Sequence, residues 1–367
     1  MFLCDEWKSS KGGLSTFNRE FAINLAETTT DSMKIHCYVS RSDDQDKEDA
    51  EQLGVNLITA QTVPGSQDPL DWLKTQPPEL PYPHIDLGKF KETTATAVTD
   101  TIEENEEKHK KEIESCKAAD AVIAVGSRLQ RKYSRSLPNV AVEIITPGIL
   151  KKFCNESIES GEHAGVLSRT LNAFKAFKFN VFMFGRATFE DLTLKGYDIV
   201  ANAIGSLGGK FELTFVGSSP GEHRNVEQWF LNNTCIKRKQ ITIRGYCTKQ
   251  DELKEMFHQS DLVAVPSRTE GFGLVGLEAI SSGVPVLVSD ESGIAEALQK
   301  VEGGNTVIVG SDEDEDEWAR RISEVSSQSP EERQTSAKQL RENYRRVYPW
   351  RMECERFKGL IEKVVKT

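Results

Sequence analysis

Short, uninterrupted apolar runs alternate along the chain with longer segments in which apolar residues recur at helical spacing. The clearest case lies between Asp261 and Asp290, where apolar residues fill positions 262–265 and 284–288 and an apolar stretch between them ends at Gly283. Strands without polar alternation are typical of a parallel sheet covered on both faces. This stretch therefore predicts a strand, a loop, a helix and a second strand, and the chain is expected to have an α/β fold.

The same pattern predicts further elements on both sides of this stretch. Strands are expected at residues 2–4, 34–39, 55–58, 121–125, 140–145, 178–184, 211–216 and 241–246. Helices are expected at 14–25, 103–117, 199–207, 251–260, 318–325 and 350–364, with a solvated helix or loop at 43–51. The region from Val63 to Lys91 contains six prolines, which excludes a central strand there.

The loop of the central stretch has the chemistry of an anion site. Gly271 and Gly273 let the main chain approach a ligand closely, and a helix that begins near Leu274 would present unpaired N–H groups and a positive dipole end. Glu270 lies on the loop and Glu278 on the helix, where side chains lean toward the N-terminus, so both carboxylates can point at one mouth. The alternative, that Glu278 is a solvated helix position, conflicts with its apolar neighbours. The loop therefore predicts a site for a diphosphate and for sugar hydroxyls.

A family resemblance rests on the segment Pro266-Ser267-x-x-Glu270-Gly-Phe-Gly-Leu, on the second glutamate eight positions later, and on Ser-Gly-Val-Pro-Val behind it. This combination resembles the donor-site signature of the retaining glycosyltransferases of family four, which have the GT-B architecture of two Rossmann-like domains facing across a cleft. The resemblance implies an acceptor domain at residues 1–150, a nucleotide-sugar donor domain at 164–345, and a terminal helix at 346–367 that packs back on the first domain.

The resemblance also implies roles for individual residues of the donor domain. Arg186 and Lys195 match the two cations that clamp the donor diphosphate, although the loop between them, 187–194, is long for the family and two surface cations remain the alternative. Positive side chains suit a leaving group whose charge grows as the glycosidic bond breaks. We expect catalytic roles for Glu270, which would orient the donor sugar, and for Arg186 and Lys195.

Further residues are expected to bind the nucleotide sugar. Glu278 would hold the ribose hydroxyls, and the amides at Gly273 and Leu274 would bind the diphosphate. The remaining candidates are Gly12, Gly13, Gly217 and Tyr246. Tyr246 lies where the family accommodates the base, and core packing explains it equally well.

The first half resembles the family less closely. The glycine pair Gly12-Gly13 after the first strand resembles the inter-domain cleft loop of the family. Only about five strands are readable before Gly148, so this domain is expected to be shortened on its acceptor side. His84 could replace the histidine that faces the acceptor in the family, but a loop histidine without a functional role is the better interpretation.

Composition narrows the class of protein. The 367 residues suffice for two domains, and a net charge of −11 with a pI near 5.3 argues against general binding of nucleic acid or anionic membranes. Neither a membrane span nor a secretory signal is readable, and the seven scattered cysteines without a Cys-x-x-Cys pair fit a cytoplasmic protein. The histidines lack metal-ligand spacing, so we expect neither a metal nor a cofactor besides the substrate.

The sequence therefore predicts a retaining glycosyltransferase that moves a sugar from a nucleoside-diphosphate donor to an acceptor hydroxyl. A protein that binds a nucleotide sugar as a sensor or scaffold is the alternative, because the acceptor half looks incomplete. An epimerase or a phosphorylase would share the fold. An epimerase would need acid and base groups in the first half, which are not found, and a glycogen-type phosphorylase would need a cofactor lysine and a longer chain. The base, the sugar, the acceptor and the oligomeric state stay open.

Overall fold

The computed structural model describes residues 2–8, 13–29, 33–60, 102–154, 178–187, 189–310 and 314–366. The chain divides into two compact units. The first unit takes in Met1–Ala124, Gln130–Pro147 and Pro349–Thr367, and the second takes in Val125–Leu129 and Gly148–Tyr348. The domain boundaries expected from the sequence stay predictions, as does the shortening of the first domain.

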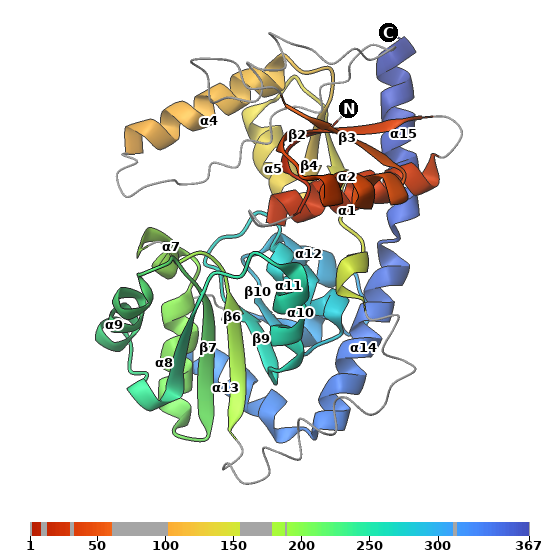
Figure 1. The fold of residues 1–367 in the computed structure, drawn as a ribbon. Helices are drawn as coiled ribbons and strands as arrows, with labels where there is room; N and C mark the ends of the chain where they lie inside the picture. The colour runs from red at the N-terminus through yellow and green to blue at the C-terminus, as the bar shows by residue number, and fades with distance from the viewer. Residues whose placement is uncertain are drawn as a thin grey trace. The chain divides into compact units, whose positions relative to one another are not determined.

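The first unit contains five strands within its described residues. They are β1 (Phe2–Glu6), β2 (Ile35–Arg41), β3 (Val55–Thr59), β4 (Val122–Val125) and β5 (Val142–Ile145). Strands β1, β2 and β3 form a parallel sheet in that order, and β4 pairs with β5 (Figure 1). The accompanying helices are α1 (Gly13–Thr28), α2 (Asp44–Gln52), α4 (Ile102–Lys117), α5 (Ser127–Ser136, whose first three residues group with the second unit) and α15 (Trp350–Lys366).

Aromatic side chains join the terminal helix α15 to α1 inside the first unit. The ring of Phe21 lies 5.0 Å from that of Phe357 and 6.1 Å from that of Trp350, measured between centroids. All three side chains are buried, so the end of the chain contributes to the core of its first segment.

The second unit is built on one six-stranded parallel sheet. Its strands are β6 (Phe179–Phe184), β7 (Phe211–Ser218), β8 (Ile241–Gly245), β9 (Leu262–Val265), β10 (Val286–Ser289) and β11 (Ile308–Val309). Its α-helices are α7 (Phe189–Leu194), α8 (Tyr197–Leu207), α9 (His223–Asn233), α10 (Gln250–His258), α11 (Leu274–Ser282), α12 (Gly293–Leu298), α13 (Glu315–Ser327) and α14 (Pro330–Val347). Short 3₁₀ turns lie at Lys151–Phe153, Arg238–Gln240 and Gly304–Val307.

The order of the strands, β11-β10-β9-β6-β7-β8, is that of a doubly wound fold. The chain starts in the middle with β6, builds outward through β7 to β8, and then returns to place β9 on the other side of β6. In open α/β sheets, ligands bind at such a reversal, beyond the carboxyl ends of the two central strands. The sheet therefore points to the loops that follow β6 and β9.

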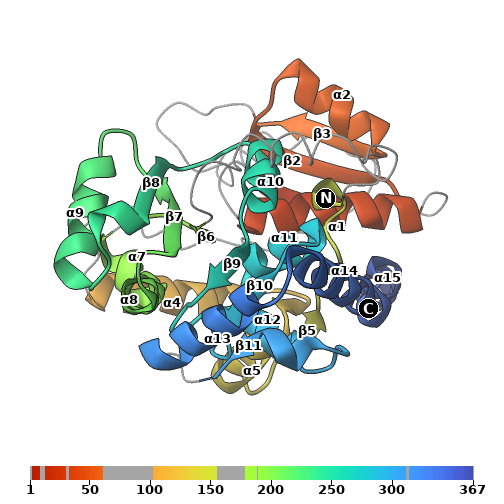
Figure 2. The ribbon, with the colours of Figure 1, turned by 90° about the horizontal axis from the view of Figure 1, so that it is seen from below.

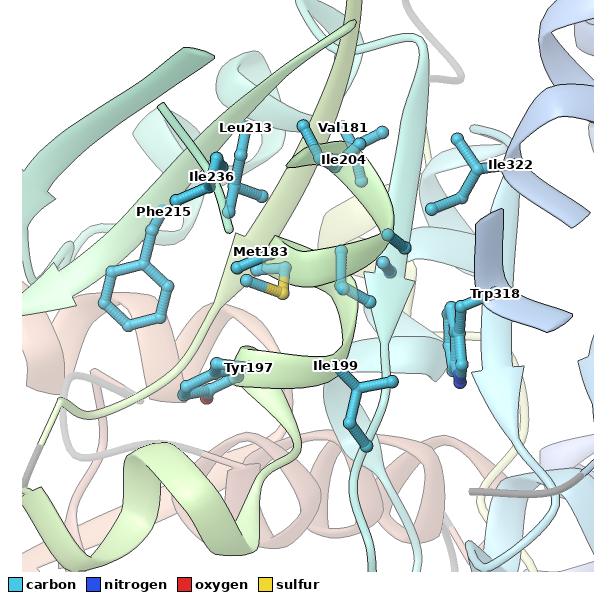
Figure 3. Packing of buried hydrophobic residues seen from close by; sticks show 14 of the residues in the cluster. Val181, Met183, Tyr197, Ile199, Ile204, Leu213, Phe215, Ile236, Trp318 and Ile322 are labelled. Atoms are coloured by element: carbon cyan, nitrogen blue, oxygen red, sulfur yellow. The ribbon is translucent and has the colours of Figure 1, made fainter. Parts of the chain in front are cut away.

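Apolar side chains fill both faces of this sheet. On one face Val181 and Met183 of β6 meet residues of α8 and α13, with Trp318 and Ile322 fully buried (Figure 3). On the other face α11 packs against β9 and β10 and lies beside α14 (Figure 2). Coverage on both faces explains why β9 and the first three residues of β10 are apolar without alternation.

The strands and helices named in the sequence analysis are present, with ends that differ by a few residues. Residues 187–194 were expected to form a loop, but Phe189–Leu194 forms the short helix α7, whose Leu192 is buried. Helices α5, α9 and α14 were not predicted. α14 has a strongly polar sequence in which a narrow stripe with Ala337, Leu340 and Tyr344 is enough to dock it. No helix in the described part of the chain is long and apolar enough to cross a bilayer.

Candidate active site

Two loops of the second unit meet at the point where the strand order reverses. One follows β6 and runs through α7 to the start of α8, and the other follows β9 and runs from Pro266 to Gly273. Lys195 lies on the first loop and Glu270 on the second, and Nζ of Lys195 lies 2.7 Å from Oε2 of Glu270. The structure thus brings together two of the predicted catalytic residues, which are separated by 75 positions in the chain.

The Lys195–Glu270 pair is accessible to solvent. Both side chains are partly exposed, Lys195 by 33% and Glu270 by 23%. The hydroxyl of the buried Ser267 also reaches Oε2 of Glu270, at 3.4 Å. The main-chain N–H of Glu270 donates to the carbonyl of Glu291 at 3.0 Å, which fixes the backbone of the loop. The glutamate is therefore held on its main chain while its carboxylate remains reachable.

A close main-chain contact sets the distance between the two loops. Gly196 has a φ of 66°, and a Cβ atom at this position would lie 2.0 Å from the carbonyl oxygen of Pro266. No side chain fits into that space. Gly196 therefore lets the turn that carries Lys195 lie directly on the loop that carries Glu270.

An ion pair links the same two loops. The guanidinium of Arg268 donates to both carboxylate oxygens of Asp198, at 2.8 and 2.9 Å, and also to the carbonyl of Thr193. The main-chain N–H of Arg268 donates to the carbonyl of Leu194 at 3.1 Å. Arg268 and Asp198 were not predicted from the sequence, because oppositely charged residues 70 positions apart do not reveal a pairing.

The glycine loop leads directly into α11. Gly273 precedes Leu274, the first residue of the helix, and has a φ of 99°, which non-glycine residues rarely adopt. A Cβ atom on Gly273 would lie 3.4 Å from Cγ of Glu270, so the carboxylate side chain lies close to the helix N-terminus. Here the first N–H groups of the helix point outward with the positive end of its dipole. The loop has the geometry expected of a diphosphate site.

Glu278 lies one turn into the same helix and is buried. Its side chain is 4% exposed, and its Oε2 atom has no hydrogen-bond partner. Burial without a partner raises the pKa of this carboxyl from 4.5 to about 8. A buried polar atom without a partner is rare in folded proteins and costs free energy, so ligand binding by Glu278 stays a prediction that this observation makes worth testing.

Arg186 and Gly217 lie at the carboxyl ends of the neighbouring strands β6 and β7. Arg186 follows Gly185 directly after β6 and is half-buried. Gly217 has a structural explanation: a Cβ atom there would lie 1.7 Å from the carbonyl oxygen of Gly185. Gly217 therefore permits the close approach of two strand ends, and its role in ligand binding stays a prediction.

Tyr246 lies just beyond the end of β8, and its ring stacks on that of Phe184, with centroids 5.3 Å apart and an angle of 26° between the planes. Its main-chain N–H donates to the carbonyl of Ser218 at 2.9 Å. The side chain is half-buried. Packing against Phe184 thus occupies one face of the ring, and contact with a base stays a prediction.

The structure does not test the site candidates of the first half. Gly13 is the first residue of α1 in the first unit. Gly12 and His84 lie outside the described residues. Their predicted contacts with the ligand or the acceptor are therefore untested.

Residues 125–129 support the glycine loop and were missed in the sequence. Gly126 has a φ of 83° and packs under Phe272, whose ring would lie 2.8 Å from a Cβ atom there. Leu129 packs against Gly271, and the hydroxyl of Ser127 donates to Glu296 at 2.6 Å. These contacts group residues 125–129 with the second unit. The glycine at 126 was the one available signal, since it follows a predicted strand.

A model of the family described as "Family 4 Glycosyltransferase in conflict systems" matches residues 1–88 and 82–357 of the chain. The chain belongs to this family. The resemblance inferred from the glutamates and glycines of the central stretch is thereby confirmed at the level of the family.

Curated relatives of this family 4 chain include two D-inositol 3-phosphate glycosyltransferases. The protein of Paenarthrobacter aurescens is 25% identical over 193 residues, which cover 51% of this chain and 41% of that protein. The protein of Rhodococcus erythropolis is 34% identical over 112 residues, which cover 26% of this chain and 25% of that protein. The matches thus span less than half the length of these relatives.

Solved structures with the same fold are matched over nearly the whole chain. Sucrose-phosphate synthase from Thermosynechococcus elongatus has a TM-score of 0.69 at 17% identity and covers 100% of this chain and 98% of its own. Anabaena HepE in complex with UDP and glucose has a TM-score of 0.65 at 16% identity and covers 99% of this chain and 98% of its own. The predicted α/β class and GT-B fold are confirmed.

Proposed function

We propose that this chain transfers a sugar from a nucleoside-diphosphate sugar to an acceptor hydroxyl, with retention of configuration at the anomeric carbon. One observation carries the proposal. The Lys195–Glu270 pair lies beside the N-terminus of α11, and the same helix holds the buried Glu278 with an oxygen that has no partner. A diphosphate needs cations and amides, and sugar hydroxyls need acceptors, and this site offers all of these.

The donor would occupy the site as follows. The diphosphate would lie on the amides at Gly273 and Leu274, with Lys195 and Arg186 as its cations. The ribose hydroxyls would donate to Glu278, whose Oε2 would then gain the partner that it lacks in the free protein. Glu270 would accept hydrogen bonds from the donor sugar. Once the diphosphate is bound, Lys195 would contact both Glu270 and the diphosphate.

In the chemical step, the bond between the anomeric carbon and the diphosphate oxygen would break while the acceptor oxygen forms its bond on the same face of the sugar. The acceptor proton would pass to the departing phosphate oxygen, so no enzyme nucleophile would be needed. Negative charge would grow on the diphosphate, and Lys195, Arg186 and the helix amides would stabilise it.

Family membership supports this proposal, as do relatives that are named as glycosyltransferases and a structural neighbour that was solved with UDP and glucose. UDP sugars are therefore the first donors to test. GDP and ADP sugars belong in the same screen, because the base is not identified by the half-buried Tyr246.

The test combines binding with turnover. Titration calorimetry with UDP, GDP and ADP should detect one preferred nucleotide. The matching sugar nucleotide should be hydrolysed slowly in the presence of the protein, with release of the nucleoside diphosphate. Glu270→Gln should lower turnover by about 100-fold or more while nucleotide binding persists, because this glutamate would act on the sugar. Glu212→Gln is a matched control, since Glu212 lies at the opposite end of the sheet at the start of β7.

Two results would count against the proposal. If none of the nucleotides binds in calorimetry, the proposed donor site is wrong. Tight binding of a sugar nucleotide that is never hydrolysed or transferred, in the wild-type protein and with a broad set of sugar acceptors, would instead support a sensor or scaffold.

A further inference from the structure

We infer that Arg268 and Asp198 form a clamp that positions Lys195 against Glu270. The clamp would set where the lysine meets the donor diphosphate, and this second step rests on the proposed function. The first step concerns the ligand-free protein alone and is tested separately.

The clamp holds the Lys195 turn at two points. On the side before Lys195, the main-chain N–H and the guanidinium of Arg268 donate to the carbonyls of Leu194 and Thr193. On the side after Lys195, the guanidinium binds both oxygens of Asp198, which lies in the first turn of α8. Lys195 therefore lies between two anchors that belong to one arginine.

Arg268 is also close in sequence to the partner of Lys195. It precedes Glu270 by two positions on the loop after β9. The arginine and the glutamate thus move with the same loop, and the lysine and Asp198 move with the other. Any shift of one loop along the other would break the contacts of Arg268 and the Lys195–Glu270 pair together.

The energies indicate which contact sets the geometry. A partly exposed lysine–carboxylate pair contributes little to stability because water screens it, and the flexible lysine stem loses rotamer freedom in forming it. A bidentate arginine–carboxylate pair is planar and directional, and here the arginine is also bonded to a main-chain carbonyl. The side chains of Arg268 and Asp198 are 23% and 21% exposed, so the clamp is also better shielded than Lys195, at 33%. The clamp is therefore the rigid link and the Lys195–Glu270 pair its consequence.

The first test measures the position of Lys195 in the ligand-free protein. An amine-reactive reagent is applied at limiting concentration, and the modified fraction of Lys195 is read from its peptide by mass spectrometry. Asp198→Asn and Arg268→Lys should each raise the labelling of Lys195 by about threefold or more, because Nζ no longer has a fixed partner. Arg320→Lys is the matched control, since Arg320 binds Glu317 on α13 in the same unit, and it should leave Lys195 labelling unchanged.

The second test separates positioning from general stability. Affinities are measured for UDP and for UMP, or for the corresponding pair of guanosine or adenosine if that base binds. The preference of the wild-type protein for the diphosphate should fall by about tenfold in Asp198→Asn, because a charge-assisted hydrogen bond to the second phosphate is lost. UMP affinity should stay within about twofold of wild type, since a monophosphate does not require the lysine.

The outcomes separate the inference from the proposed function. Unchanged Lys195 labelling in both clamp variants would overturn the clamp, and an equal loss of UDP and UMP affinity would overturn its role in positioning. A wild-type protein that binds no nucleotide would contradict the proposed function, and Lys195 labelling would still support or overturn the clamp.

Discussion

At the scale of the residue, Glu278 is the candidate site residue with the most unusual environment. Its carboxyl is removed from water and its Oε2 has no partner, so the folded protein carries a free-energy cost at this position. The apolar neighbours on the helix already predicted that a charge here would need a partner. The structure adds that, among the described residues, no protein group provides one for this oxygen, which leaves a ligand as the candidate.

The first prediction concerns stability as a function of pH. The pKa of Glu278 is raised from 4.5 to about 8, so between these pH values the folded protein keeps a proton that the unfolded chain has lost. The free energy of unfolding is therefore not reduced by this carboxyl below about pH 4.5, and it falls as the pH rises toward 8. Glu278→Gln has no titrating group at this position. The free energy of unfolding of the variant, relative to that of the wild type, should therefore increase across this pH range by on the order of a few kcal/mol.

Urea denaturation at several pH values from 4.5 to 8 measures this difference. A gap between the two proteins that does not change with pH would mean that the carboxyl ionises in the folded state as easily as in the unfolded chain. Glu315→Gln is a suitable control because Glu315 lies on the surface at the start of α13.

The second prediction concerns the release of the Glu278 proton when a nucleotide binds. Ribose hydroxyls donate hydrogen bonds, so they favour the ionised form of Glu278, and binding should release a proton when the pH is below about 8. Affinity for the preferred nucleotide diphosphate should rise with pH up to that value, after correction for titration of the phosphate itself. Calorimetry in buffers of different ionisation enthalpy counts the proton, and Glu278→Gln should abolish its release.

At the scale of elements, the start of α8 decides how closely the two loops of the site approach. Gly196 caps this helix in a left-handed conformation, and its Cα lies against the main chain of Pro266. The sequence predicted the helix and the lysine before it. It did not show that the glycine between them faces a second loop, because nothing local distinguishes this glycine from an ordinary helix cap.

The third prediction tests this contact. Gly196→Ala should lower the free energy of unfolding by more than about 2 kcal/mol, because the φ of 66° is unfavourable for alanine and the new methyl group would lie 2.0 Å from a carbonyl oxygen. Gly209→Ala is the control, since no atom lies within 4 Å of the added carbon, and it should stay within about 0.5 kcal/mol of wild type. Equal effects of the two substitutions in urea denaturation would contradict the contact.

The whole second unit is organised by where its strand order reverses. β6 and β9 are adjacent although α7 to α10 lie between them in the chain, and their following loops carry Lys195 and Glu270. Ligand binding should therefore act on a defined set of segments that are distant in sequence, and the rest of the unit should change little.

The fourth prediction uses hydrogen exchange to map this set. The preferred nucleotide diphosphate should slow amide exchange at residues 193–198 and 266–278, since these segments line the proposed site. Helices α9 and α13 belong to the same unit and are not among the segments proposed to line the site, so their exchange should not change. Protection limited to α9 or α13 would place the ligand elsewhere.

The sequence by itself determined the α/β class, the strand–loop–helix–strand order of the central stretch, and the family. These depend on local features: apolar periodicity, glycines where the chain turns, and two glutamates at a spacing that one loop and one helix turn can bring together. Tertiary structure alone decided that Lys195 meets Glu270, that Arg268 meets Asp198, and that Gly217 serves strand packing. Such pairings depend on the order of the strands in the sheet, and local periodicity carries no information about which distant loops that order brings side by side.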